Sequence, residues 1–205
     1  MEGTHPVNKK LAAALSGGAV LVLALSGCTS SGGSGGSSAS DDKLGSWAKQ
    51  VCDAVQPQAK KIADANTAIQ KETSDNSTPE QVQKTDSQAF QDMSDAYKAM
   101  GAAVDTAGAP EVDNGATKQK NAVKELNDTS AAYAALEKQV NGLDTKDQAK
   151  FADGLKGIAT QLDKLSKTGN DALKELEAGD VGKAMTQQES CKSASASASA
   201  SATVG

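Results

Sequence analysis

The chain has 205 residues, a formal net charge of -5 and aromatic side chains at 2% of its positions. All 21 basic residues are Lys, and the single His, His5, precedes the first apolar run. An acidic chain without Arg offers no basic surface to a phosphate backbone, and so few aromatic rings leave little on which bases or sugars could stack. We therefore expect no nucleic-acid binding.

Residues 1–27 have the composition of a secretory signal peptide. Lys9 and Lys10 precede an apolar run from Leu11 to Leu25. This run is shorter than the roughly 20 residues that a membrane-spanning helix needs. It ends in the four residues of a bacterial lipobox, which are Leu25, Ser26, Gly27 and Cys28.

Residues 7–28 resemble the signal peptides of bacterial lipoproteins. The resemblance implies that the Cys28 thiol receives a diacylglycerol group with palmitate-like chains and that the chain is cleaved before Cys28. Two acyl chains, at about 0.8 kcal/mol per buried CH₂, give lasting attachment to the outer face of the cytoplasmic membrane. The alternative is an ordinary secreted protein in which Cys28 carries no lipid. Residues 1–6 fit this pattern poorly, which leaves Met1 and Val7 as alternative starts.

Composition divides the remaining chain into three parts. Residues 28–40 are the lipidated Cys and a Gly/Ser tether, and residues 41–192 form one domain. Residues 193–205 are predicted to be disordered, because their alternating Ser and Ala bury too little surface to hold a packed element. The chain after Cys28 has no His and no Arg, which excludes imidazole bases, His-ligated metals and Arg clamps.

The central domain shows the apolar periodicity of amphipathic helices and no strand pattern. Thr78, Pro79 and Gln81 are typical of a capping box at a helix start. The pattern predicts an all-α protein, an up-down-up-down four-helix bundle with a short fifth C-terminal helix. The predicted helices are Asp42 to Lys71 with a kink at Pro57, Thr78 to Gly108, Gly115 to Val140, Asp144 to Leu176, and Val181 to Gln188.

Cys52 and Cys191 remain once Cys28 is lipidated, and export places them where disulfides persist. In an antiparallel bundle the end of the fourth helix returns to the start of the first, close to Cys52. We therefore predict a structural disulfide between them. Reactive or metal-bound thiols are the alternative, but the chain has no C-x-x-C motif.

Four polar residues fall near the phase of the apolar stripes: Asn66, Asp86, Ser130 and Glu137. They would mark either a hydrated part of the helix seams or an all-carboxylate metal site, and we favour the hydrated seam. The sequence accordingly assigns no catalytic residue, metal or cofactor.

Further residues have both a structural and a functional interpretation. We expect Trp47 to close one end of the bundle, and Met93 and Met100 to belong to the core. Gly154 and Gly157 lie inside the predicted fourth helix, where they indicate either close packing or a groove.

Three further stretches of the chain are distinctive: 52–57 (CDAVQP), 150–155 (KFADGL) and 178–184 (AGDVGKA). Together with the lipobox, the tether and the Cys pair, they make the whole chain resemble the small secreted lipoproteins of actinobacteria. The resemblance implies no activity. We expect a non-enzymatic binding or scaffolding role in the bacterial cell envelope, with an envelope protein as partner. The alternative is a receptor for a small ligand or cation held in a cleft between helices, and a hydrolase ranks third.

Overall fold

The computed structural model describes residues 38–72, 77–168 and 171–202. All regular structure within these ranges is α-helical, which confirms the all-α class. The helices are α2 (Ser38–Glu72), α3 (Pro79–Ala107), α4 (Gly115–Asn141), α5 (Gln148–Thr168), α6 (Asp171–Leu176), α7 (Asp180–Thr186) and α8 (Glu189–Ala202).

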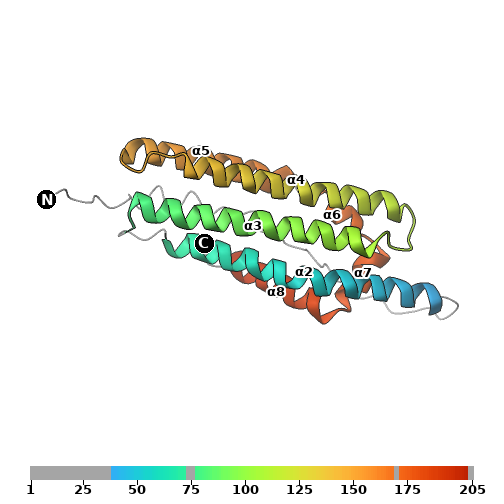
Figure 1. Cartoon of the computed structure of the whole chain (residues 1–205). Helices are drawn as coiled ribbons and strands as arrows, with labels where there is room; N and C mark the ends of the chain where they lie inside the picture. Colours follow the sequence, from blue (N-terminus) through green and yellow to red (C-terminus); the bar gives the residue numbers. More distant parts are fainter. Residues whose placement is uncertain (1–37, 73–76, 169–170, 203–205) are drawn as a thin grey trace.

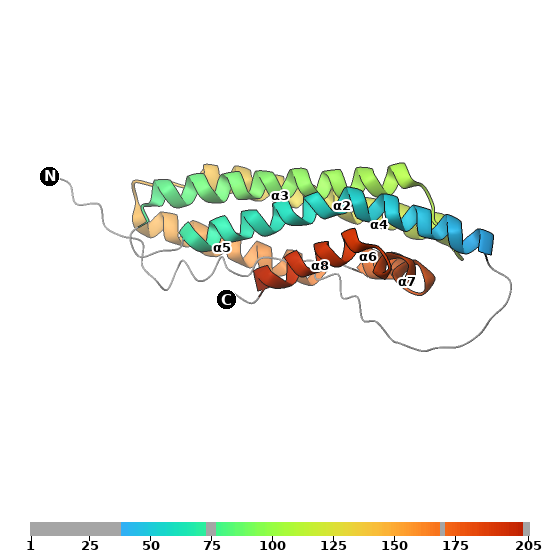
Figure 2. The ribbon, with the colours of Figure 1, turned by 90° about the horizontal axis from the view of Figure 1, so that it is seen from below.

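The long helices lie side by side and alternate in direction along the chain (Figure 1). α3 packs between α2 and α4, and α5 runs back along α4. The short helices α6 and α7 bring the chain to the end of the molecule where α2 begins. From there α8 runs alongside α2 in the same direction (Figure 2).

The start of α3 follows the predicted capping box. The Gln81 backbone N–H donates to Thr78 Oγ1 at 3.3 Å, and the Thr78 N–H donates to Gln81 Oε1 at 2.8 Å. Pro79 occupies the first turn, where its missing N–H would have no helical partner. These contacts satisfy donors that every helix start leaves free.

The start of α5 was predicted three to four residues too early. Asp144 accepts a hydrogen bond from the Lys146 N–H at 3.0 Å and so stabilises a turn. Asp147 then accepts from the Lys150 N–H at 3.1 Å, which makes Asp147 the cap of the helix that begins at Gln148. Two Asp residues with capping chemistry lie within four positions, and the periodicity alone does not choose between them.

The predicted fourth helix is in fact two helices, because α5 ends at Thr168 and α6 begins at Asp171. The first turn of α6 is completed from another helix: the Glu125 carboxylate of α4 accepts the N–H groups of Ala172 at 2.9 Å and Leu173 at 3.3 Å. The predicted short fifth helix is α7, which ends at Thr186 and not at Gln188.

The prediction of a disordered Ser/Ala tail was wrong as far as Ala202, because α8 spans Glu189–Ala202. The predicted Gly/Ser tether likewise loses Ser38 to Ser40 to the start of α2. Ala has the strongest helix propensity of all residues, so the tail needs only a surface on which to pack. α2 supplies that surface, and Ala194 in the α8 interface is 1% exposed.

The core lies between the predicted apolar stripes. The stripe on α3 is confirmed in full, and Leu126, Tyr133, Leu136 and Val140 of α4 are also buried. Tyr97 of α3 stacks on Tyr133 of α4 with ring centroids 5.5 Å apart, and Phe90 lies 6.2 Å from Tyr133. Burial raises the pKa of both Tyr hydroxyls well above their usual value. These rings therefore act as packing groups and do not ionise.

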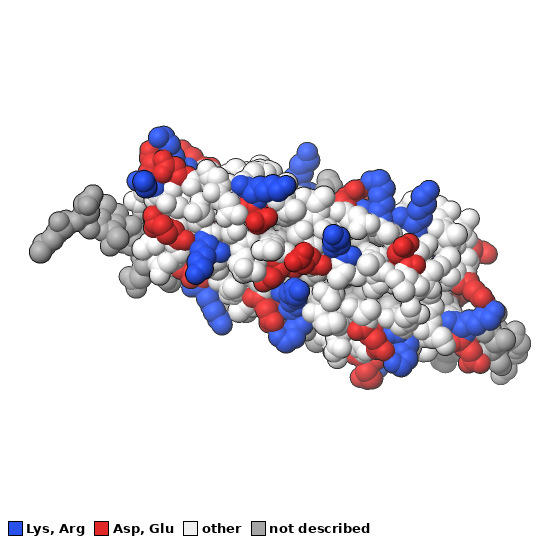
Figure 3. Space-filling view, viewed as in Figure 1, with Lys and Arg blue, Asp and Glu red and all other residues white. Residues whose placement is uncertain are grey.

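On the face shown in Figure 3, Lys and acidic side chains are scattered over the surface, with the two signs of charge interspersed. Most of the ion pairs lie one helical turn apart, as in Lys60–Asp64 and Lys167–Asp163. Exposed pairs of this kind add a few tenths of a kcal/mol each. On the face shown, the two signs of charge are mixed and neither gathers into one patch.

Candidate functional site

The lipobox residues Leu25, Ser26, Gly27 and Cys28 lie outside the described residues, as do Thr29 to Ser37 of the predicted tether. The structure therefore bears on the protein's function through the helical domain alone. Within the described ranges, no helix combines the length and the apolar character that crossing a bilayer requires.

The structure joins Cys52 of α2 to Cys191 of α8 in a disulfide, with Cα atoms 5.0 Å apart. This is the pairing that the cysteine count and the predicted helix order suggested. Both residues are fully buried, at 0% and 1% exposure. Beside them, the Ser190 hydroxyl donates to the Asp53 carboxylate, which Lys49 also contacts at 2.5 Å. The hydrogen bond from Lys49 contributes most to lowering the pKa of Asp53, and that from Ser190 contributes next.

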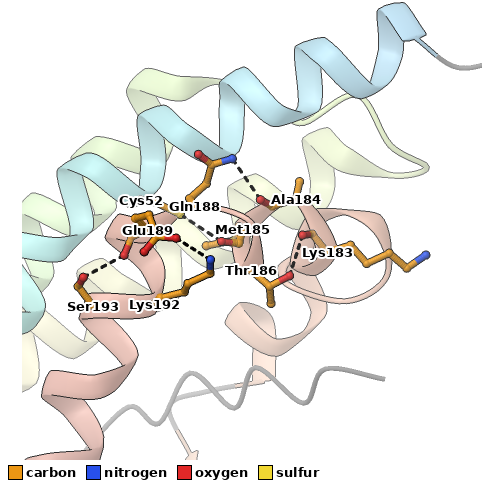
Figure 4. Close-up of polar contacts among 9 residues, drawn as sticks. All are labelled: Cys52, Lys183, Ala184, Met185, Thr186, Gln188, Glu189, Lys192 and Ser193. Atoms are coloured by element: carbon orange, nitrogen blue, oxygen red, sulfur yellow. Dashed lines mark hydrogen bonds and ion pairs between the residues drawn. The ribbon is translucent and has the colours of Figure 1, made fainter. Parts of the chain in front are cut away.

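Local side-chain contacts shape the corner between α7 and α8 that positions Cys191 (Figure 4). The Thr186 hydroxyl donates to the Lys183 carbonyl at 2.7 Å, and the Gln188 amide donates to the Ala184 carbonyl at 3.3 Å. The Lys192 ammonium pairs with Glu189 at 2.7 Å in the first turn of α8. Met185 is buried in this corner, and its carbonyl oxygen lies 4.0 Å from Cys52 Sγ. The disulfide is thus a structural bond without solvent access.

The Trp47 indole packs at the end of the domain where α3 turns into α4. Its N–H donates to the Gly108 carbonyl at 2.8 Å, and the residue is 6% exposed. Met93 and Met100 are buried in the core. The structural interpretation is therefore confirmed for all three residues.

The two glycines of α5 have different surroundings. A Cβ atom on Gly154 would lie 2.3 Å from Leu143 Cδ2, whereas one on Gly157 would meet no atom within 4 Å. Gly154 thus allows the α4–α5 connection to pack closely against the helix, and Gly157 faces open space.

The polar residues of the stripes do not converge on one site. Asn66, Asp86 and Ser130 are buried, but Glu137 is only partly buried and accepts a hydrogen bond from Asn141 at 3.1 Å. Ser94 of α3 donates to the Ser130 carbonyl at 2.9 Å and so links α3 to α4. Among the described residues, no group of three or more His, Cys, Asp or Glu is arranged to hold a metal ion.

Asp86 differs from every other carboxylate in the described ranges. It is 1% exposed, and its Oδ2 has no hydrogen-bond partner. Burial, with a smaller contribution from the negative charge of Glu72, raises the pKa of Asp86 to about 7. A sequence signal for this was available, since Asp86 falls on the apolar stripe of α3 between Val82 and Ala89. Burial also raises the pKa of Glu177 to about 7, which the sequence did not indicate.

An open groove of about 480 Å³ lies between α4 and the segment around α6. Its carboxylates outnumber its single ammonium group, and Leu165 supplies part of an apolar wall. The sequence could not reveal this groove, because α5 and α6 were predicted as one helix. The lining residues are Asn121, Lys124, Glu125, Asp128, Thr129, Leu165, Asp171, Ala172 and Glu175.

Comparisons of the chain with protein-family models, with curated proteins and with solved structures find no match. No relative therefore supplies a function or a set of functional residues.

Proposed function

We propose that this protein is a lipid-anchored helical domain on the outer face of a bacterial cytoplasmic membrane. There it binds or scaffolds an envelope protein and catalyses no reaction. The observation that carries the proposal is the N-terminal sequence, in which Lys9 and Lys10, the apolar run and the lipobox ending in Cys28 follow one another. The Cys52–Cys191 disulfide supports it, because disulfides persist outside the reducing cytosol.

The finer fold proposal is that α2, α3, α4 and α5 form the up-down-up-down bundle. The alternating directions of these four helices support it. In this arrangement α8 is an added helix, bound to the outside of α2 through the disulfide.

The non-enzymatic part of the proposal rests on the available chemical groups. Without His or Arg after Cys28, catalysis would fall to Lys, carboxylates, Tyr or hydroxyls. Tyr97 and Tyr133 are locked in the core, and Asp86 is enclosed away from the groove. Carboxylates with a pKa near neutrality are the usual candidates for acid–base chemistry, but Asp86 does not line the groove between α4 and α6.

The anchor is tested by the Cys28→Ala substitution in the native host. We expect loss of membrane attachment or stalled processing, while Ser26→Ala, which keeps the lipobox pattern, should leave attachment intact. Intact-mass analysis should show a diacylglycerol adduct on an N-terminal Cys28. An unmodified Cys28 in membrane-free protein would refute the anchor.

The partner is tested by cross-linking on intact cells. An envelope protein should be captured by the wild-type chain and lost in the Cys28→Ala variant, because lipidation brings the two to one membrane. Equal capture by both would show that the anchor does not direct the interaction.

A receptor for a small cationic ligand is the second candidate, and the acidic groove is the observation that favours it. Glu125, Asp128, Asp171 and Glu175 line the groove against Lys124, which already pairs with Asp128. Native mass spectrometry of the full-length chain distinguishes the two functions. A stoichiometric small molecule or cation on the protein would favour the receptor over a pure scaffold.

A further inference from the structure

Asp86 is a buried acid without a compensating interaction. Asp86 is 1% exposed, and its Oδ2 has no hydrogen-bond partner. Burial, and not a hydrogen bond, is the main cause of its raised pKa. A carboxylate in this position would lack both water and a counter-charge, which is costly in an apolar interior. The neutral acid is therefore the form that fits the packed helices.

The charged groups at this end of the molecule do not relieve that cost. Glu72 of α2 acts on Asp86, and because it is negative it favours the protonated form further. The nearby cations lie on exposed positions, and none contributes to the pKa of Asp86. The other described charged groups at this end include Lys71 on α2, Glu80 and Lys84 on α3, Glu137 and Lys138 on α4, Asp144 and Lys146 in the turn between α4 and α5, and the Asp147–Lys150 pair at the start of α5.

The helix α2 packs against α3. The first half of α2 is fixed by the Trp47–Gly108 hydrogen bond, the Cys52–Cys191 disulfide and the Lys43–Glu111 ion pair at 2.9 Å. Beyond Pro57, α2 is held to the core through packing of Ile62, Ala65 and Ile69.

Pro57 separates these two halves. Its ring removes one backbone hydrogen bond from α2 and crowds the preceding turn, and prolines inside helices are therefore common points of bending. Pro57 thus lies between the disulfide-bonded first half of α2 and residues 58–72.

We propose that the protonation state of Asp86 controls whether the second half of α2, residues 58–72, stays packed against α3. In the protonated state the acid packs between the helices and the seam is closed. When the proton leaves to solvent, the carboxylate requires water, and the segment beyond Pro57 separates locally from α3 to admit it. This device is independent of the lipid anchor and of any ligand in the acidic groove.

The direction follows from linkage. The closed state binds the Asp86 proton more tightly than the open state, where the pKa returns toward its usual value of 3.8. Closure is therefore most favourable at acid pH and weakens as the pH rises toward about 7. Between about pH 5 and about pH 8 the opening equilibrium should rise about 100-fold. In most proteins the folded state instead becomes less stable in acid, because carboxylates that form ion pairs become protonated there.

The test is hydrogen exchange of the full-length chain at these two pH values, expressed as protection factors so that the intrinsic effect of pH is removed. Peptides from residues 58–72 should lose about 100-fold protection at the higher pH. Peptides from residues 43–56 should change little. An equal loss in both halves would mean global unfolding and would overturn the local opening.

Two variants make the test specific. Asp86→Asn keeps the shape of the protonated acid and cannot ionise, so its protection in residues 58–72 should not respond to pH. Asp95→Asn removes an exposed carboxylate from the same helix and should respond like the wild type. A pH response that persists in Asp86→Asn would show that Asp86 does not control the opening of residues 58–72.

A measurement on the wild-type chain covers the case in which Asp86→Asn does not fold. In a ¹³C NMR titration of the Asp carboxyl groups, Asp86 should titrate near neutrality and its transition should coincide with the loss of protection. Titration of every Asp near its ordinary value would overturn the proposal.

Discussion

Gly154 and Gly157 lie one helical turn apart in α5 and show how far a single residue depends on what surrounds it. Both lack a side chain in a helix interior, where Gly is less favourable than Ala by about 0.5–1 kcal/mol. Only Gly154 has a neighbour that requires the missing Cβ, since Leu143 occupies that space. The sequence signal is the same at both positions, and the physical cause is not.

The first prediction is that Gly157→Ala stabilises the protein by about 0.5–1 kcal/mol, because helix propensity improves and nothing obstructs the new methyl group. Gly154→Ala should be less stable than Gly157→Ala, because the methyl group must displace Leu143. Urea unfolding of the two variants measures the difference. Equal stabilisation by both would show that the contact with Leu143 has no energetic weight.

The helix breaks of this protein depend on contacts from distant parts of the chain. α3 begins where its own sequence says it should, because Thr78, Pro79 and Gln81 supply the cap locally. α6 begins where Glu125 of another helix accepts two of its backbone N–H groups. A cap supplied from 47 positions away leaves no trace in the local sequence.

The second prediction follows from that cap. Glu125→Ala should destabilise the protein by about 1–3 kcal/mol, because two N–H groups lose a charged acceptor. Asp128→Ala on the same helix should cost less than about 0.5 kcal/mol, because its pair with Lys124 is exposed. Thermal unfolding of both variants provides the comparison. A larger loss from Asp128→Ala would contradict this account of the α6 start.

The sequence predicted those helix ends and buried residues that depend on contacts between neighbouring residues, and it missed those that depend on distant parts of the chain. Local signals predicted the α3 cap, the end of α4 to within one residue, at Val140 where the helix ends at Asn141, and most of the buried apolar residues. The start of α5 was missed because Asp144 and Asp147 have the same capping chemistry. α8 was missed because its stability comes from packing on α2, which the Ser/Ala pattern does not encode.

The same distinction applies to the candidate sites. Burial of Asp86 could be anticipated from its position in the apolar stripe, whereas its lack of any partner depends on which side chains surround it in three dimensions. The acidic groove was not anticipated, since it lies beside α6, which was predicted as part of one long helix with α5.

At the scale of the whole molecule, the disulfide closes most of the described chain into one loop, with 139 positions between Cys52 and Cys191. Without the disulfide, the unfolded chain gains conformational entropy, which stabilises the unfolded state by about 4–5 kcal/mol in the chain-entropy model. Loss of the disulfide also removes the covalent bond that joins α8 to α2.

The third prediction is therefore that reduction lowers the free energy of unfolding by about 4–5 kcal/mol. Denaturant unfolding with and without reductant measures this loss, and circular dichroism should show a fall in helix content as α8 leaves α2. Cys191→Ala should reproduce the loss and become insensitive to reductant. Free alkylation of both thiols in natively exported protein would contradict the disulfide itself.

The entry point of α2 sets the orientation of a molecule held at Cys28. α2 begins at the same end as α7 and the turn between α3 and α4, and it extends for 35 residues, roughly 50 Å at 1.5 Å per residue. In the proposed anchored protein, Cys28 precedes this end of α2, and the disulfide and Trp47 lie in the half of α2 that follows the anchor most closely in the chain. The end with Glu72 and the turn between α4 and α5 is the opposite end of the helices, and we expect a bulky envelope partner to contact it first.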